Sequence, residues 1–185
     1  MNLTKLFEAQ RVLDERIEQE HPRTEGENRL PQKILALQVE LGEMANEWRG
    51  FKFWSQNRNP VTKSIRPIFG TNVDGTQFQD FKECNPLLEE TVDVLHFILS
   101  IGNETGFTDL SQMEEIWTDG DTLRRFSDLY YRIALFESNE LEDYYREMFR
   151  HFLLLTHSLG FSWEEIETAY YEKNKINHER QDGGY

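Results

Sequence analysis

The stretch NPLLEETVDVLHFILSIG, residues 85–102, is the most apolar segment of the chain and yet carries acidic side chains. Asn85 is a favourable helix N-cap, Pro86 suits the first helical position, and Gly102 is a natural helix stop. The Thr and Val content would tolerate a buried strand, but a length of about sixteen residues between the two caps favours a helix. The segment therefore predicts a buried helix that bears carboxyl groups.

Helical spacing of apolar residues recurs on both sides of this segment. We expect helices over Leu3–Glu20, Pro31–Trp48, Leu110–Trp117, Thr122–Glu137 and Leu141–Leu159, and a last one from the capping box Ser162–Glu165 to about Asn177. Residues 55–85 show no sustained period and predict a long loop or lid. Without a repeat or a convincing strand pair, residues 1–185 are expected to form a single all-α domain, a helical bundle.

The composition restricts the possible partners. Acidic residues outnumber basic ones by 34 to 20, and the net charge of −14 argues against direct binding of nucleic acid or of an anionic membrane. The single cysteine, Cys84, excludes an internal disulfide and a cysteine-built zinc site. The apolar runs are too short to cross a bilayer, and MNLTKLFEAQ lacks the apolar core of a secretory signal, so we expect a cytoplasmic protein.

Two acidic pairs carry the chemical signal. Glu40 and Glu43 are three residues apart on one helix, a pattern that alone is usual on a solvated face. Glu90 and Asp93 repeat the spacing inside the most apolar segment, where ionised carboxylates are costly unless they are compensated. Four carboxylates from two facing helices would suit Mg²⁺ or Mn²⁺, and they predict phosphoryl hydrolysis with one carboxylate as general base. Alternatively, Lys or Arg from another helix pairs with the acids, and Phe97 beside them is ordinary core.

The last predicted helix carries a polar face. Lys173, Asn177 and Arg180 step by four and then three residues, so they line one side, where a phosphate could dock. The alternative is a solvated helix end at which the helix dipole favours cations.

Taken together, four blocks of the sequence resemble a known family. They are LFEAQRVLDERI, ELGEMANEWRGFKFWS, LLEETVDVLHFILSIG and YYEKNKINHERQDGGY, and they span most of the chain. This combination is similar to the dimeric all-α dUTPases, relatives of the MazG-like nucleoside triphosphate pyrophosphatases. The acidic pairs belong to the whole superfamily, whereas FKFW, the His-Phe after the second pair and the K-N-x-x-N-x-x-R-Q terminus point to the dUTPase branch.

The resemblance implies a homodimer that hydrolyses dUTP, and often dUDP, in a Mg²⁺-dependent reaction that yields dUMP. It implies that Glu40, Glu43, Glu90 and Asp93 hold Mg²⁺ and position the attacking water, with Glu40 as the base. Related enzymes with another base preference and a regulatory binding module are the alternatives.

The resemblance also implies contacts to the substrate. Gln10 and Trp54 would bind uracil, and Phe97 would pack on the deoxyribose. The phosphate and nucleotide contacts would be Lys173, Asn177 and Arg180, with Lys52 as a possible addition; Asp14 follows the first block, and Glu47 and His96 are neighbours rather than ligands. Residues 55–85 and 105–140 do not fit the shared blocks, and they could form a lid, a dimer surface or a docking site for a regulatory protein partner.

Overall fold

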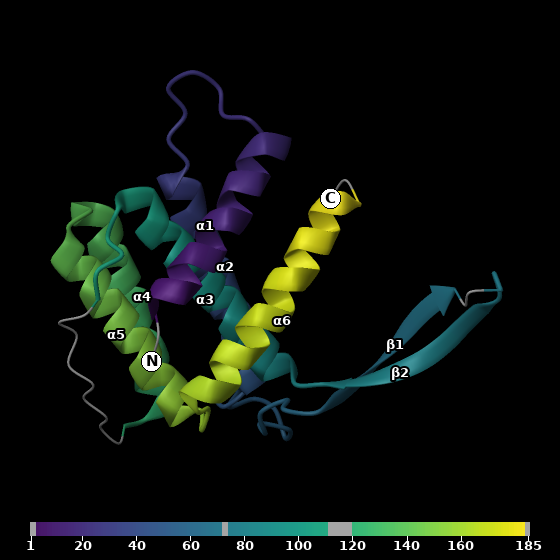
Figure 1. Ribbon diagram of the computed structural model, residues 1–185. Coiled ribbons are helices and arrows are strands. Elements are labelled where there is room, and N and C mark those ends of the chain that lie inside the picture. Colours follow the sequence, from purple (N-terminus) through teal and green to yellow (C-terminus); the bar gives the residue numbers. More distant parts are fainter. Residues whose placement is uncertain (1–2, 72–73, 111–119, 184–185) are drawn as a thin grey trace.

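The computed structural model describes residues 3–71, 74–110 and 120–183. Within these residues the elements follow in the order α1 (Leu3–Glu20), α2 (Leu30–Trp48), β1 (Ser64–Thr71), β2 (Gln77–Cys84), α3 (Pro86–Thr105), α4 (Thr122–Asn139), α5 (Glu142–Ser158) and α6 (Trp163–Asp182) (Figure 1). The helices make up one bundle with a common apolar core, which confirms the predicted all-α fold class. None of the described helices combines the length and the low charge that a membrane span requires.

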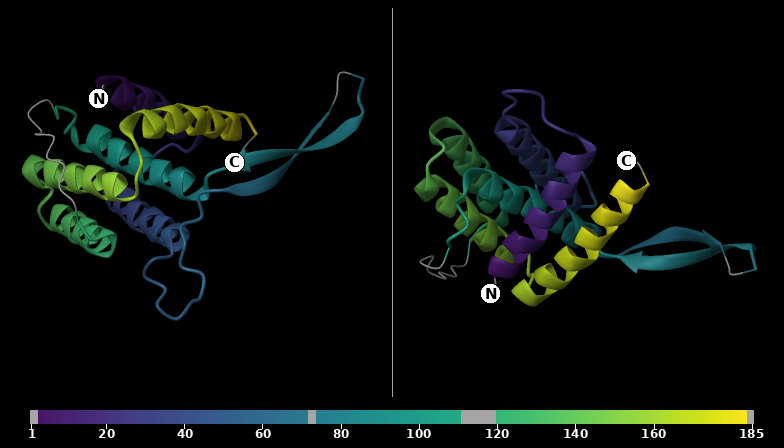
Figure 2. Two further views of the ribbon diagram at one scale, coloured as in Figure 1. Left: turned by 90° about the horizontal axis from the view of Figure 1, so that it is seen from below. Right: turned by 45° about the horizontal axis from the view of Figure 1, so that its top comes forward.

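Helix α3 is the centre of the bundle, as its apolar sequence predicts. It packs against α1, α2, α5 and α6, and Figures 1 and 2 show it enclosed by these neighbours. The Asn85 side chain accepts a hydrogen bond from the Leu88 N–H at 3.1 Å, which caps the first turn, and Pro86 follows it. Burial of α3 on most of its circumference explains why its acidic residues cannot simply face solvent.

Gly102 does not end α3, contrary to our prediction. The helix continues to Thr105, and Gly106, with φ of 77°, follows it in the left-handed conformation. Gly102 is buried, and a Cβ at this position would lie 2.7 Å from Phe7 Cε1 and also overlap the Tyr145 hydroxyl. The glycine therefore permits close helix packing.

The last helix is capped as predicted but is longer. The Ser162 hydroxyl accepts a hydrogen bond from the Glu165 N–H at 3.3 Å, and the Glu165 carboxylate accepts one from the Ser162 N–H at 2.9 Å. Helix α6 then runs to Asp182 rather than to Asn177. The predicted helix over 110–117 lies, beyond Leu110, outside the described residues.

Residues 55–85 contain a pair of strands, so our prediction of a long loop in a chain without a strand pair was wrong. Strands β1 and β2 form an antiparallel hairpin in which Ser64 lies opposite Cys84 and Thr71 lies opposite Gln77. The hairpin leads into the N-terminal end of α3, and its far end projects away from the helices (Figures 1 and 2). Nearly all its described side chains are exposed, so it lacks the alternation of buried and exposed positions that identifies a strand in a sequence.

Candidate active site

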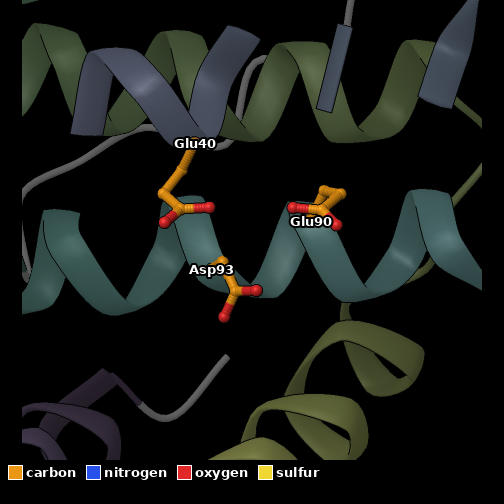
Figure 3. Close-up of side chains that lie close together, drawn as sticks. All are labelled: Glu40, Glu90 and Asp93. Atoms are coloured by element: carbon orange, nitrogen blue, oxygen red, sulfur yellow. The ribbon is translucent and has the colours of Figure 1, made fainter. Parts of the chain in front are cut away.

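Three carboxyl groups meet where α2 packs against α3. Glu40 comes from α2, and Glu90 and Asp93 lie about one turn apart on α3. Figure 3 shows Glu40 reaching from α2 toward α3, with Glu90 at the edge of α3 that is nearer α2 and Asp93 at its other edge. One carboxylate oxygen from each lies within 4.8 Å of the others, and all three residues are partly buried. Glu43 is exposed and is not part of this group, although its charge contributes to raising the pKa of both Glu40 and Glu90.

The electrostatics of the three groups favour a bound cation. Burial, followed by the charge of Asp93, raises the pKa of Glu40 to about 7 and that of Glu90 to about 7. Lys173 Nζ lies 2.5 Å from Asp93 Oδ2, so the alternative of an ion pair from another helix is realised for Asp93. In the described part of the chain, no Lys or Arg side chain forms an ion pair with Glu40 or Glu90. An all-oxygen set in which two carboxyl groups have no ion pair among the described residues fits a hard divalent cation such as Mg²⁺.

A cavity of about 470 Å³ borders Glu40 and Asp93 and is large enough for a small organic ligand. Helices α1, α2, α3 and α6 contribute to its wall. Its lining includes seven of the residues predicted as metal ligands or substrate contacts, namely Gln10, Asp14, Glu40, Asp93, Phe97, Asn177 and Arg180. The structure thus brings most of the predicted substrate contacts around one cavity, next to carboxyl groups that could hold a metal ion.

A buried polar network forms one wall of this cavity. The Gln10 Nε2 amide group donates a hydrogen bond to Asp14 Oδ1 at 2.8 Å. The other end of the amide, Oε1, accepts a hydrogen bond from the Tyr170 hydroxyl at 3.0 Å and lies 2.7 Å from His96 Nδ1. Because Oε1 can only accept, His96 carries its proton on Nδ1. Burial lowers the pKa of His96 to about 3, so the ring is neutral and Nε2 is a bare acceptor.

Two polar atoms of this wall lack a hydrogen-bond partner in the described residues. They are His96 Nε2 and Asp14 Oδ2, and both residues line the cavity. Asp14 Oδ1 is satisfied by Gln10 and by the Ser100 hydroxyl at 3.0 Å, whereas burial raises the pKa of the carboxyl group. Buried polar atoms without partners are costly, so a ligand that supplies donors here would be stabilised.

Sequence reasoning missed part of this wall. Tyr170 and Ser100 look like ordinary core residues of their helices, and no sequence signal distinguishes them. His96, interpreted only as a neighbour, has a weak signal, because it lies one turn after Asp93 on the same helix.

Lys52 and Trp54 are not part of the cavity lining. The Trp54 side chain is 65% exposed and packs edge-on against Phe51 and Phe53 at centroid distances of 5.7 and 5.0 Å. Lys52 Nζ donates to the Asn46 carbonyl oxygen at 3.2 Å and lies over the Phe51 ring. Their contacts with a nucleotide stay a prediction.

The polar face predicted on α6 is directed toward the site. Arg180 donates a hydrogen bond to Asn177 Oδ1 at 3.4 Å, and both residues line the cavity. Lys173, one turn before Asn177 on the same helix, forms the ion pair with Asp93. The positive charge of Arg180 also lowers the pKa of Asp93, against the effect of burial. This face is therefore more than a solvated helix end.

Comparison with family models agrees with this geometry. The family model described as dUTPase matches residues 2–74 and 76–185, which is nearly the whole chain. Comparison with curated proteins gives no match. A match of this extent, together with the helical fold, shows that the chain belongs to the all-α dUTPase family and that its activity is that of a dUTP diphosphatase, a hydrolase of nucleotide metabolism.

Proposed function

We propose that the protein hydrolyses dUTP to dUMP and pyrophosphate in a Mg²⁺-dependent reaction, that it also accepts dUDP, and that it thereby keeps uracil out of DNA. The observation that carries this proposal is the group of three partly buried carboxyl groups, Glu40, Glu90 and Asp93, beside a cavity of nucleoside size. Mn²⁺, which also prefers oxygen ligands, is the expected substitute for Mg²⁺.

Glu40, Glu90 and Asp93 would hold the metal, and Glu43 would add an exposed carboxylate at the edge of the group. When bound, Mg²⁺ supplies positive charge that neutralises the phosphate oxygens. Glu40 is the proposed general base and takes a proton from the attacking water as the anhydride bond between the α- and β-phosphates breaks. Lys173 favours the ionised form of Asp93 through its ion pair, against the effect of burial, which raises the pKa of Asp93.

The cavity wall would bind the nucleoside. Phe97, partly buried beside Asp93, would pack on the deoxyribose, and Asn177 and Arg180 would contact the nucleotide from α6. Uracil carries an N–H at ring position 3, whereas cytosine carries an acceptor there. His96 Nε2 is buried in this structure, so a contact with uracil requires a small movement of the wall. Once reached, this bare acceptor favours uracil, and Gln10 and Asp14 hold the ring of His96 in that tautomer.

We also propose a homodimer. Phe53 and Trp54 are 81% and 65% exposed, and exposed apolar groups of this kind mark interaction surfaces. Trp54 does not line the cavity of its own copy, and in a dimer it would contact a nucleotide bound to the partner copy. Light scattering should then give twice the monomer mass, and a monomer at micromolar concentration would contradict this. The regulatory protein partner and the cytoplasmic location stay predictions.

A pyrophosphate-release assay on dUTP, dCTP, dTTP and UTP, with Mg²⁺ or with EDTA, tests the proposed function. We expect dUTP to be hydrolysed well ahead of the others, and only with the metal. Equal rates across the nucleotides would contradict the preference for dUTP, and a faster rate on another nucleotide would favour a related enzyme with another base preference. Full activity in EDTA would contradict the metal requirement. Glu40→Gln should keep the fold and abolish hydrolysis.

A further inference from the structure

A second cavity, of about 140 Å³, lies between the hairpin and helices α3 and α6. Four cations contribute to its lining, namely Arg66 from β1, Lys82 from β2, and Lys173 and Arg180 from α6. Two carboxylates, Glu89 and Glu172, also line it. The lining thus has an excess of positive charge in a chain whose net charge is −14.

The hairpin places two of these cations together. Arg66 lies directly opposite Lys82 in the antiparallel register, so both side chains leave the same face of the hairpin. Like charges in this arrangement destabilise a strand pair. Arg66 is compensated by Glu89 at 2.5 Å, whereas Lys82 forms no ion pair within the described residues. The two facing cations, Arg66 and Lys82, therefore do not stabilise the hairpin itself, and a bound anion would compensate their charges.

The second cavity adjoins the carboxyl groups of the site. Lys173 lines it while its ammonium group contacts Asp93, and Arg180 lines both this cavity and the larger one. The nucleoside-sized cavity and the cationic cavity are therefore neighbours that share Arg180, with Asp93 in the lining of the first and its partner Lys173 in the lining of the second. A nucleoside triphosphate has a matching arrangement, because its uncharged nucleoside and its terminal phosphates are at opposite ends.

We propose that Arg66 and Lys82 of the hairpin, together with Lys173 and Arg180, bind the terminal phosphates of the nucleotide, the part that leaves as pyrophosphate. This inference rests on the proposed function and assigns a role in it to the hairpin. Charge-assisted hydrogen bonds to phosphate oxygens are the expected contacts, and Arg66 can form two of them at once.

Calorimetric titration with inorganic pyrophosphate in the presence of Mg²⁺ tests the proposal. Arg66→Gln and Lys82→Gln should each weaken pyrophosphate binding about tenfold, as expected for loss of one charge-assisted hydrogen bond. Both variants should raise the KM for dUTP but leave dUMP binding unchanged, because dUMP lacks the terminal phosphates. Lys63→Gln is the matched control, since Lys63 is an exposed cation just before β1 that does not line the cavity.

Glu89→Gln separates a phosphate contact from a structural tether. If Arg66 only anchors the hairpin through its ion pair, Glu89→Gln and Arg66→Gln should have the same effect. A phosphate contact predicts that Glu89→Gln binds pyrophosphate at least as tightly as the unmodified protein, since a cation is released and a negative charge is lost. Arg66→Lys, which keeps the charge, should bind more tightly than Arg66→Gln.

Two outcomes distinguish failure of this inference from failure of the proposed function. Normal dUTP hydrolysis with unchanged KM and pyrophosphate binding in both hairpin variants would overturn the phosphate site and leave the function intact. Pyrophosphate binding that depends on Arg66, in a protein that hydrolyses no dUTP, would support the phosphate site and reject the function.

Discussion

Replacing Glu90 with Gln should make the metal-free protein more stable, although it should remove activity. The pKa of Glu90 rises from 4.5 to about 7, mainly through burial and then through Asp93 and Glu43. Without any screening by solvent, a change in pKa of this size corresponds to about 3 kcal/mol of unfolding free energy. Because Glu90 is only partly buried and solvent screens its charge, we expect a gain of about 1–2 kcal/mol.

The sign of this effect depends on pH. A carboxyl group whose pKa is higher in the folded state than in the unfolded state destabilises the fold when it is ionised. The penalty is complete above pH 7 and disappears as the pH falls below 4.5. For a chain of this size the gain corresponds to a rise in Tm of roughly 2–8 °C at pH 8 and to little change near pH 4.5.

Thermal unfolding followed by circular dichroism in EDTA measures this gain. Glu89→Gln is the matched control, because Glu89 is the adjacent acid but pairs with Arg66, so this variant should not be stabilised. Adding Mg²⁺ should raise the Tm of the unmodified protein more than that of Glu90→Gln. A lower Tm for Glu90→Gln at pH 8 in EDTA, or an equal gain at both pH values, would refute the reasoning.

Two further predictions concern the packing of α3. Glu104, whose pKa Arg23 and Lys33 lower to about 2, contributes stability that is present above pH 4.5 and is lost as the pH falls toward 2. Urea unfolding of Glu104→Gln should therefore show a loss of about 1–2 kcal/mol at pH 7 that vanishes near pH 2, and an equal loss at both pH values would contradict the ion pairs. Gly102→Ala should cost about 1–3 kcal/mol in the same assay despite the better helix propensity of Ala, because the new Cβ would overlap Phe7 and Tyr145, and an unchanged midpoint would contradict the close packing.

Much of the helical fold was predictable because local signals decide it. Asn85 with Pro86, and Ser162 with Glu165, mark helix starts that the structure confirms. The stop expected at Gly102 was wrong because tertiary packing against Phe7 and Tyr145, rather than a turn, requires that glycine. The hairpin was missed because its exposed side chains leave no periodic burial pattern.

The candidate site was predictable where spacing along one helix decides it, as for Glu90 and Asp93. The buried wall of the site was not predictable, because Gln10 contacts His96, which is 86 positions away in the sequence, and Tyr170, which is 160 positions away. A single sequence carries no signal for such pairs. The same limit applies to the cationic cavity, which depends on the position of the hairpin beside α6.

Calorimetric titration of Mn²⁺, in the presence of a non-hydrolysable dUTP analogue, tests the central claim that the carboxyl groups between α2 and α3 hold the catalytic metal. We predict that Glu89→Gln binds Mn²⁺ at least as well as the unmodified protein, and that Glu90→Gln binds it at least tenfold more weakly. Equal Mn²⁺ affinity in Glu90→Gln and in the unmodified protein would contradict the claim.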